Sequence, residues 1–228
     1  LRYGKRFADT PREVIFRSTV GPLSDSPGFL LPLTLLPAMV RGEGIEVAGD
    51  VSQQLLKNLP QLQFILQTFA PSFGHDIREI DVKATPRLMD PLPARRGAAC
   101  FFSGGADSMY SALKLRDELD ALIFVHGVDT RLNDPELRAT VVAGVRRAAE
   151  AIGLPLIEVE TAAREFADRF VHWELYYGSP LASIALLLEK QFSKFYIAGG
   201  RALPRLFSSG SHPMLDPLWS TESTQVIY

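Results

Sequence analysis

A short run of residues near the middle of the chain constrains its fold more than any other. The apolar residues 98–102 lead into Ser103-Gly104-Gly105, and the chain then continues through Asp107 into a helical stretch. Paired glycines let backbone N–H groups converge on an anion, and a following helix directs its positive end to the same point. The run therefore predicts a phosphate-binding turn between a buried strand and a helix.

Apolar strand-like segments alternate with helix-like segments after this run. We expect strands at residues 98–102, 121–126, 156–160, 195–198 and 225–228, and helices at 107–118, 135–152 and, in broken form, 163–192. Nearly continuous apolar strands that alternate with helices predict an α/β fold, a parallel twisted sheet with helices on both faces. A Rossmann-like domain is therefore expected over residues 98–228, with ligands beyond the carboxyl ends of its strands.

The helix at residues 135–152 has clear end signals. Asp134 is a good N-cap, Pro135 suits the first position, and Gly153 suits the stop. Apolar residues at helical spacing predict which face is buried. The expected buried stripe consists of Leu137, Val141, Val145, Ala148 and Ile152.

The chain before this domain has a mixed pattern. Residues 13–18, 44–47 and 76–83 are strand-like, whereas 28–40 and 52–69 are helix-like with apolar faces. We interpret residues 1–85 as a small α+β accessory domain. Residues 86–97 include Pro86, Pro91 and Pro93 and are interpreted as an extended linker.

Composition excludes several classes of protein. The formal charge of −2 gives no general attraction to nucleic acid, and the longest apolar stretch, residues 29–40, is too short to span a bilayer. Cys100 is the only cysteine, which excludes an intrachain disulfide and a cysteine-rich metal site within these residues. A protein with no membrane partner is expected, and the expected localisation is cytoplasmic.

The six residues from Ser103 to Ser108 read Ser-Gly-Gly-Ala-Asp-Ser. They match the Ser-Gly-Gly-x-Asp-Ser signature of the PP-loop ATP pyrophosphatases (adenine nucleotide alpha-hydrolase-like proteins). The chain resembles this superfamily over about residues 98–198, and is nearest in kind to the synthase domains of asparagine synthetase and β-lactam synthetase. It contains neither a Walker motif nor a Gly-x-Gly-x-x-Gly run after a strand. The resemblance implies a HUP/PP-loop fold with ATP and Mg²⁺ as cofactors.

The resemblance also implies roles for individual residues. The loop would hold the pyrophosphate of ATP, and Asp107 would be a catalytic residue and a Mg²⁺ ligand. His126 could instead be a hydrogen-bonded residue at a strand end, and Asp129 could meet the ribose or cap a turn. The expected nucleotide-binding residues are Phe102, Ser103, Gly104, Gly105, Ala106, Asp107, Ser108, Val125, His126 and Gly199, with Phe101 as a further adenine neighbour.

The chain departs from the asparagine synthetase pattern after Gly200, where an acidic metal ligand is absent. Arg201 and Arg205 are candidate substrate-binding residues, or else solvated arginines. The polar segment 208–222 has the composition of a substrate loop, or of an ordered proline-rich connection. It contains a candidate substrate residue, His212, and two candidates for the missing ligand or a catalytic base, Asp216 and Glu222. Aromatic residues Trp173, Tyr176 and Tyr177 could line a pocket or belong to the core.

The resemblance leads to a functional hypothesis. ATP would convert a small-molecule carboxylate or amide into its adenylate with release of pyrophosphate, and an amine or ammonia would then displace AMP. A homodimer or a separate ammonia-supplying partner is compatible with this ligase. The alternatives are a tRNA-modifying enzyme of the thiolation or lysidine type, which the single cysteine and the low charge disfavour, and a non-catalytic nucleotide-binding module.

Overall fold

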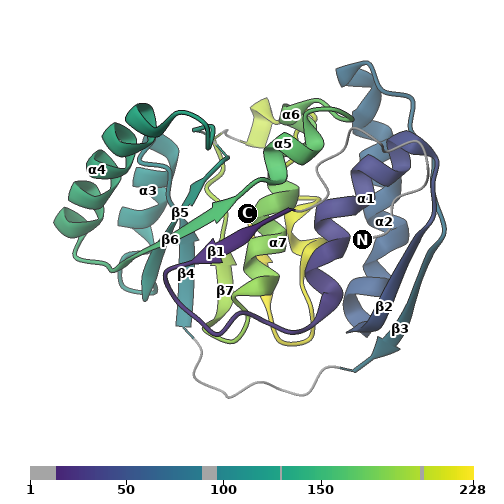
Figure 1. The fold of residues 1–228 in the computed structure, drawn as a ribbon, viewed down its shortest axis with the longest axis horizontal. Coiled ribbons are helices and arrows are strands. Elements are labelled where there is room, and N and C mark those ends of the chain that lie inside the picture. Colours follow the sequence, from purple (N-terminus) through teal and green to yellow (C-terminus); the bar gives the residue numbers. More distant parts are fainter. Residues whose placement is uncertain (1–13, 89–96, 129, 201–202) are drawn as a thin grey trace.

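A computed structural model describes residues 14–88, 97–128, 130–200 and 203–228 (Figure 1). Its centre is a six-stranded sheet in the order β1-β6-β5-β4-β7-β8. Five neighbouring strands are parallel, and β1 pairs antiparallel with β6 at one edge. The strands are β1 (Phe16–Ser18), β4 (Gly97–Phe101), β5 (Ala121–His126), β6 (Leu156–Thr161), β7 (Phe192–Tyr196) and β8 (Gln225–Ile227). The expectation of an α/β fold with a mostly parallel sheet is thus confirmed.

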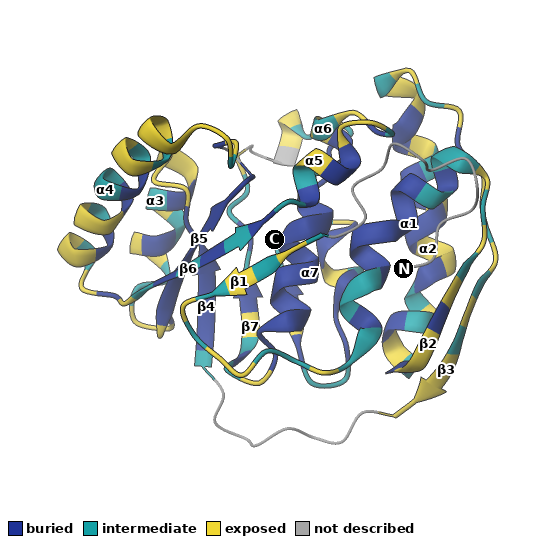
Figure 2. Cartoon of the chain, in the orientation of Figure 1, coloured by how far each residue is buried: buried dark blue, intermediate teal, exposed yellow. Residues whose placement is uncertain are grey.

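Helices cover both faces of this sheet, as the alternation along β5 illustrates. Leu122 and Phe124 face a core formed with α3 (Ala106–Lys114) and α4 (Pro135–Ile152). Ile123 and Val125 face the larger core on the other side. That core includes α1 (Leu30–Arg41), α2 (Gln53–Phe69), α5 (Ala163–Ala167), α6 (Trp173–Tyr176) and α7 (Gly178–Leu187). Figure 2 shows α7 as a buried helix in the middle of the molecule, and all ten of its residues are buried.

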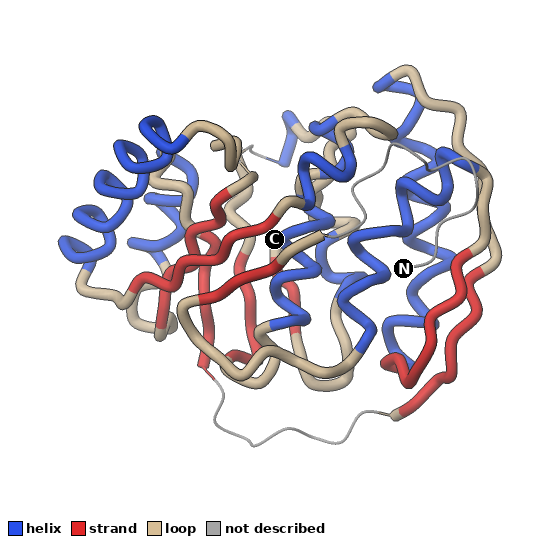
Figure 3. The backbone as a smooth tube through the Cα atoms, viewed as in Figure 1, coloured by secondary structure: helices blue, strands red, loops and turns tan. Residues whose placement is uncertain are grey.

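The region before residue 85 shares the core of the sheet. The expected N-terminal strand is β1, which joins the main sheet beside β6, and α1 packs on α7. A separate parallel pair, β2 (Ile45–Ser52) and β3 (Val82–Arg87), lies beyond α2 (Figure 3). Strand β3 extends past residue 85, into the expected linker, because its backbone pairs with β2 as far as Arg87. Residue 85 therefore falls inside β3, and buried residues before and after it belong to one hydrophobic core.

The ends of α4 lie where the sequence predicts them, but the helix does not bury the face that the apolar spacing predicts. Asp134 Oδ1 accepts a hydrogen bond from Leu137 N at 3.0 Å, and Gly153 ends the helix at φ 77°. The fully buried residues are Val142, Val145 and Ala149, whereas Leu137 is 48% exposed. The expected Val141, Ala148 and Ile152 are only partly buried against the same core. Apolar residues occupy adjacent positions here, so spacing alone left the helix rotation undetermined.

No helix among the described residues is long and apolar enough to cross a membrane.

Candidate functional site

The loop between β4 and α3 has a backbone that requires glycine. Gly104 has φ 80°, a conformation that residues with a side chain rarely adopt, and an added Cβ would lie 3.2 Å from Val145 Cγ2. Gly105 then takes an extended conformation as the N-cap of α3. Gly104 therefore serves the sharp change of direction between the strand and the helix, whereas Gly105 has a backbone conformation that any residue can adopt.

Two serine hydroxyls close this loop on itself. Ser103 Oγ and Ser108 Oγ are 3.2 Å apart, and Ser108 Oγ donates to the carbonyl oxygen of Gly105 at 2.9 Å. No side chain caps α3, whose N–H groups at the first turn have no partner within the helix. The loop thus presents hydroxyls, backbone donors and the positive end of a helix dipole, which together favour an anion.

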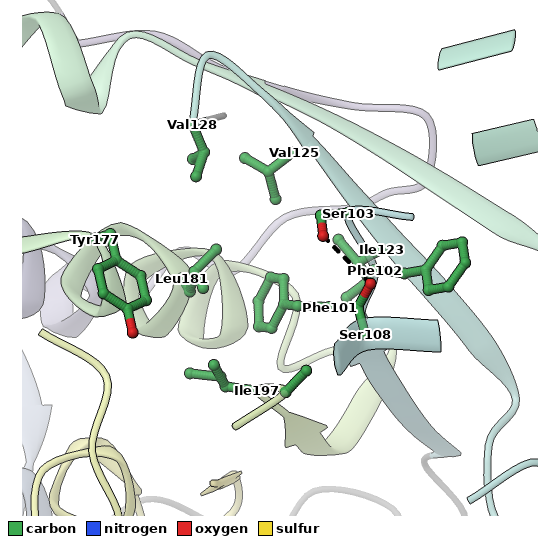
Figure 4. Close-up of a pocket in the computed structure, with 11 residues that line it drawn as sticks. Phe101, Phe102, Ser103, Ser108, Ile123, Val125, Val128, Tyr177, Leu181 and Ile197 are labelled. Carbon is green, nitrogen blue, oxygen red and sulfur yellow. Dashed lines mark hydrogen bonds between the residues drawn. The ribbon is translucent and has the colours of Figure 1, made fainter. Parts of the chain in front are cut away.

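A cavity of about 160 Å³ adjoins the loop at the carboxyl ends of three strands. Strands β4 and β7 are neighbours, but the chain leaves β4 for β5 on the other side, so the strand order reverses here. Such a switch point is where open α/β sheets bind ligands. The cavity is lined by Phe101, Phe102, Ser103, Ser108, Ile123, Val125, Val128, Tyr177, Leu181, Ile197 and Ala198 (Figure 4).

The lining is polar at one end and apolar along its length. Ser103 and Ser108 lie at the loop, and the Tyr177 ring lies at the opposite end (Figure 4). Among the residues that the structure describes, none of those that line the cavity is charged. The Phe102 side chain points away and packs in the core with α3 and α4, so its backbone faces the cavity. The arrangement suits a ligand with an uncharged flat part and an anionic part.

Asp107 lies in the first turn of α3 and is exposed. An added Cβ on Gly200 would lie 2.9 Å from Asp107 Oδ2, so the chain after β7 comes close to the loop. Gly199 instead packs against the Tyr228 ring and lines a neighbouring cavity with Tyr110. Within the described residues no group of three or more His, Cys, Asp or Glu side chains could hold a metal ion. Asp107 is therefore the acidic side chain that the loop itself offers to a cation.

His126 points to the other face of the sheet from Val125. Its Nε2 lies 2.9 Å from Glu158 Oε2, and its ring packs edge-on to Phe124 with centroids 4.7 Å apart. Burial raises the pKa of Glu158, but hydrogen bonds from His126 and Arg146 outweigh it and the pKa is lowered overall. Of the two roles considered for His126, the structure shows the hydrogen-bonded residue at a strand end. Asp129 lies outside the described residues.

The polar segment 208–222 divides between the pocket and a distant helix. Ser209 Oγ is 3.0 Å from the Tyr177 hydroxyl, which brings the start of the segment to the cavity wall. Asp216 is fully buried behind it, and burial raises its pKa to about 7. His212 is also buried, with Nδ1 accepting from Met214 N at 3.1 Å and its ring edge-on to Phe69. Neither Asp216 nor His212 lines the cavity.

Glu222 lies at the start of α2, away from the loop. Its carboxylate accepts from Ser52 Oγ at 2.6 Å and from Gln54 N at 2.9 Å. These hydrogen bonds outweigh burial and lower its pKa, so it caps α2 as a charged group. The structure therefore does not bring Glu222 to the loop of residues 103–108. Arg205 is exposed on a 3₁₀ helix (Leu203–Arg205) and does not line the cavity, and Arg201 lies outside the described residues.

The three aromatic residues before α7 have different environments. Tyr176 is core, since it is fully buried and its hydroxyl donates to Leu33 O at 2.8 Å. Trp173 packs under the Arg164 guanidinium, 4.6 Å from the ring centroid. Tyr177 alone of the three lines the cavity. The sequence did not single out Ile123, Val128, Leu181 and Ile197. Apolar residues of strands and helices carry no motif that distinguishes a residue lining a pocket from one in the core.

A scan against protein-family models gives no match to the chain, and a search of curated proteins gives none either.

Proposed function

We propose that this protein is an AMP-forming adenylating ligase. It would bind ATP at the loop of residues 103–108, transfer the adenylyl group to a small-molecule carboxylate or amide, and release pyrophosphate. An amine or ammonia would then attack the adenylate, form a C–N bond and displace AMP. The single observation that carries the proposal is the Ser-Gly-Gly-Ala-Asp-Ser loop placed beside a cavity at the switch point of a parallel sheet.

The loop suits the departing pyrophosphate. Negative charge develops on this group as the bond to the α-phosphorus breaks, and donors fixed in advance stabilise such charge without rearrangement. The hydroxyls of Ser103 and Ser108 and the first N–H groups of α3 are held in place by the loop's own hydrogen bonds. The apolar length of the cavity suits the adenosine part, which would pack on Ile123, Val125 and Val128.

The residues present fit a magnesium ion bound mainly through ATP. Mg²⁺ in nucleotide sites keeps several waters and takes one or two carboxylates together with phosphate oxygens. Asp107 supplies one exposed carboxylate beside the loop and close to Gly200. Bound there, Mg²⁺ would neutralise charge on the leaving pyrophosphate. Asp216 and Glu222, buried or capping α2, are not proposed as its ligands.

The direct test is ATP–pyrophosphate exchange, screened over candidate acids after ATP binding has been measured by calorimetry. We expect ATP with Mg²⁺ to bind, and one class of acid to support exchange. Exchange that needs RNA would favour a tRNA-modifying enzyme. ATP binding without pyrophosphate release under any condition would favour a nucleotide-binding module.

Variants of the loop locate the site. Ser108→Ala removes a hydroxyl that faces the cavity and is expected to weaken ATP binding roughly fivefold to tenfold, because hydrogen bonds to charged groups are stronger than neutral ones. Asp107→Ala should leave the ATP affinity measured without Mg²⁺ unchanged. It should reduce the increase in ATP affinity that Mg²⁺ gives. Asp117→Asn, an exposed change just after α3, is the matched control. Equal ATP affinity in Ser108→Ala and Asp117→Asn would place the nucleotide elsewhere.

A further inference from the structure

Asp216 is a buried acidic group that the proposed reaction does not use. It begins a 3₁₀ helix (Asp216–Trp219) and is fully buried. Its Oδ2 accepts a hydrogen bond from Ser211 Oγ at 2.6 Å, and its Oδ1 accepts from His212 N at 3.3 Å. Both bonds return to the chain four and five residues earlier, so the carboxyl group orders residues 211–216 as a closed turn.

The residue that anchors Tyr177 lies just before this turn. Ser209 Oγ is 3.0 Å from the Tyr177 hydroxyl, and Gly210 joins Ser209 to Ser211 at the start of the turn. Burial raises the pKa of Tyr177, Asp216 and Glu174 raise it further, and the two serines lower it. Tyr177 therefore remains a neutral phenol whose hydroxyl is anchored to Ser209.

Backbone contacts hold the turn against the start of α7. Gly210 N donates to Glu174 O at 2.7 Å. An added Cβ on Gly178 would lie 2.7 Å from the carbonyl carbon of Gly210, so the two backbones touch at these glycines. On the other side, His212 packs edge-on against Phe69 of α2 at a centroid distance of 5.0 Å. The segment whose Ser209 hydroxyl anchors Tyr177 is thus packed on both sides.

The anchored ring forms the end of the cavity opposite Ser103 and Ser108. Its hydroxyl turns away from the loop, which leaves the ring itself to line the cavity (Figure 4). An aromatic ring gives a large, rigid contact surface for a flat uncharged group. Leu181 of α7 and Val128 after β5 line the same part of the cavity. Within the described part of the chain, the lining at this end contains no charged side chain that would favour an ionic ligand group.

We propose that the Tyr177 ring contacts the adenosine part of bound ATP, that Ser209 positions this ring through the tyrosine hydroxyl, and that Asp216 supports Ser209 by ordering the turn that follows it. The proposal rests on the proposed function, because ATP is the ligand. It gives the segment 208–216 a role in nucleotide binding although most of its side chains do not reach the cavity. It also explains why a carboxyl group is kept in a buried position where it costs stability.

The test is a double-mutant cycle on ATP affinity, measured by calorimetry with Mg²⁺. Tyr177→Phe and Ser209→Ala should each weaken ATP binding roughly threefold to tenfold, the effect of one lost hydrogen bond. If Ser209 acts through the tyrosine hydroxyl, the double variant should bind ATP no more weakly than Tyr177→Phe. Additive losses in the double variant would overturn the proposal, because a purely structural role of Ser209 predicts additivity.

Further variants test the ring and the carboxyl group. Tyr177→Ala should weaken ATP binding at least tenfold, whereas Asp117→Asn, an exposed matched control, should not change it. Asp216→Asn retains an acceptor for Ser211 and should bind ATP like the wild type, and Asp216→Ala should bind it like Ser209→Ala. Melting midpoints check that each variant is folded, and Ser209→Ala carries the test if Asp216→Ala does not fold.

The possible failures are distinguishable. A wild-type protein that does not bind ATP refutes the proposed function, and this proposal with it. ATP binding that Tyr177→Ala leaves unchanged refutes the role of the ring alone. The ATP site at the loop would then still stand on the Ser108→Ala result.

Discussion

The contact between Gly178 and Gly210 predicts that one methyl group will destabilise the fold. In Gly178→Ala the new Cβ would lie 2.7 Å from the carbonyl carbon of Gly210, closer still to its oxygen, and 3.0 Å from Ser211 Cα. These are backbone atoms, which cannot rotate away as a side chain can. Gly210 is confined as tightly, because a Cβ added there would lie 2.6 Å from the carbonyl carbon of Leu175. The two segments must therefore separate to admit the methyl group.

The size of the effect follows from this separation. Real Cβ contacts below 3.0 Å are essentially absent, so the backbones must move apart by about 1 Å, and overpacking of a tight interior costs roughly 1 to 3 kcal/mol. The bond from Gly210 N to Glu174 O, now 2.7 Å, would lengthen as well. We expect a loss of about 2 to 3 kcal/mol, which for a protein of this size lowers the melting midpoint by about 4 to 12 °C.

The assay is thermal and urea unfolding, followed by circular dichroism, with Gly144→Ala as the matched control. Gly144 lies inside α4, and the nearest atom to its added Cβ is Arg147 Nη2 at 3.9 Å. This variant should gain about 0.5 to 1 kcal/mol from helix propensity. The same substitution is thus expected to have opposite signs at the two sites. A Gly178→Ala midpoint equal to that of the wild type would refute the close approach of the two segments.

Three further predictions concern ionisable groups. Asp216 has a folded pKa of about 7, above its unfolded value of about 3.9, so the folded state retains a proton that the unfolded state releases. Stability should therefore fall as pH rises between about 4 and 7, and the wild type should lose roughly 2 to 3 kcal/mol relative to Asp216→Asn between pH 5 and 8 in urea unfolding. An identical pH dependence in the two proteins would contradict the burial of a titrating Asp216. Glu222→Gln should cost about 1 kcal/mol of stability through the cap of α2 while ATP affinity, measured by calorimetry, stays unchanged. Cys100 is fully buried, and burial raises its pKa to about 12, so iodoacetamide should alkylate it at pH 8 only in urea. Rapid alkylation of the folded protein, detected by mass spectrometry, would show that Cys100 in β4 is accessible to the reagent.

Much of the fold around the loop could be predicted from local patterns. The strands at residues 121–126 and 156–160, the ends of α4 and the turn at Gly104 follow from apolar runs, capping residues and paired glycines. Each of these signals acts over a few neighbouring residues. The rotation of α4 did not follow, because Val141 and Val142 are equally apolar and only packing against the sheet distinguishes them.

The site could be predicted only in part, for a similar reason. Asp216 and Glu222 are both acids in one polar segment, yet one is buried behind Tyr177 and the other caps α2. His126 and Val125 are adjacent, but successive residues of a strand point to opposite faces, and only Val125 lines the cavity. The positions of these residues in the sequence did not reveal which face of the sheet would line the cavity.

The sequence by itself determined the turn between β4 and α3: an apolar strand, two glycines and a helix start place the unpaired N–H groups of a helix beside a tight turn. Only the tertiary structure decided what lies opposite those donors. It brought Tyr177 and residues 209–216 to the far wall of the cavity, and it placed β1 at the edge of the sheet. The physical reason is range, because turns and caps are set by neighbouring residues, whereas the cavity is formed where segments distant in the chain pack together.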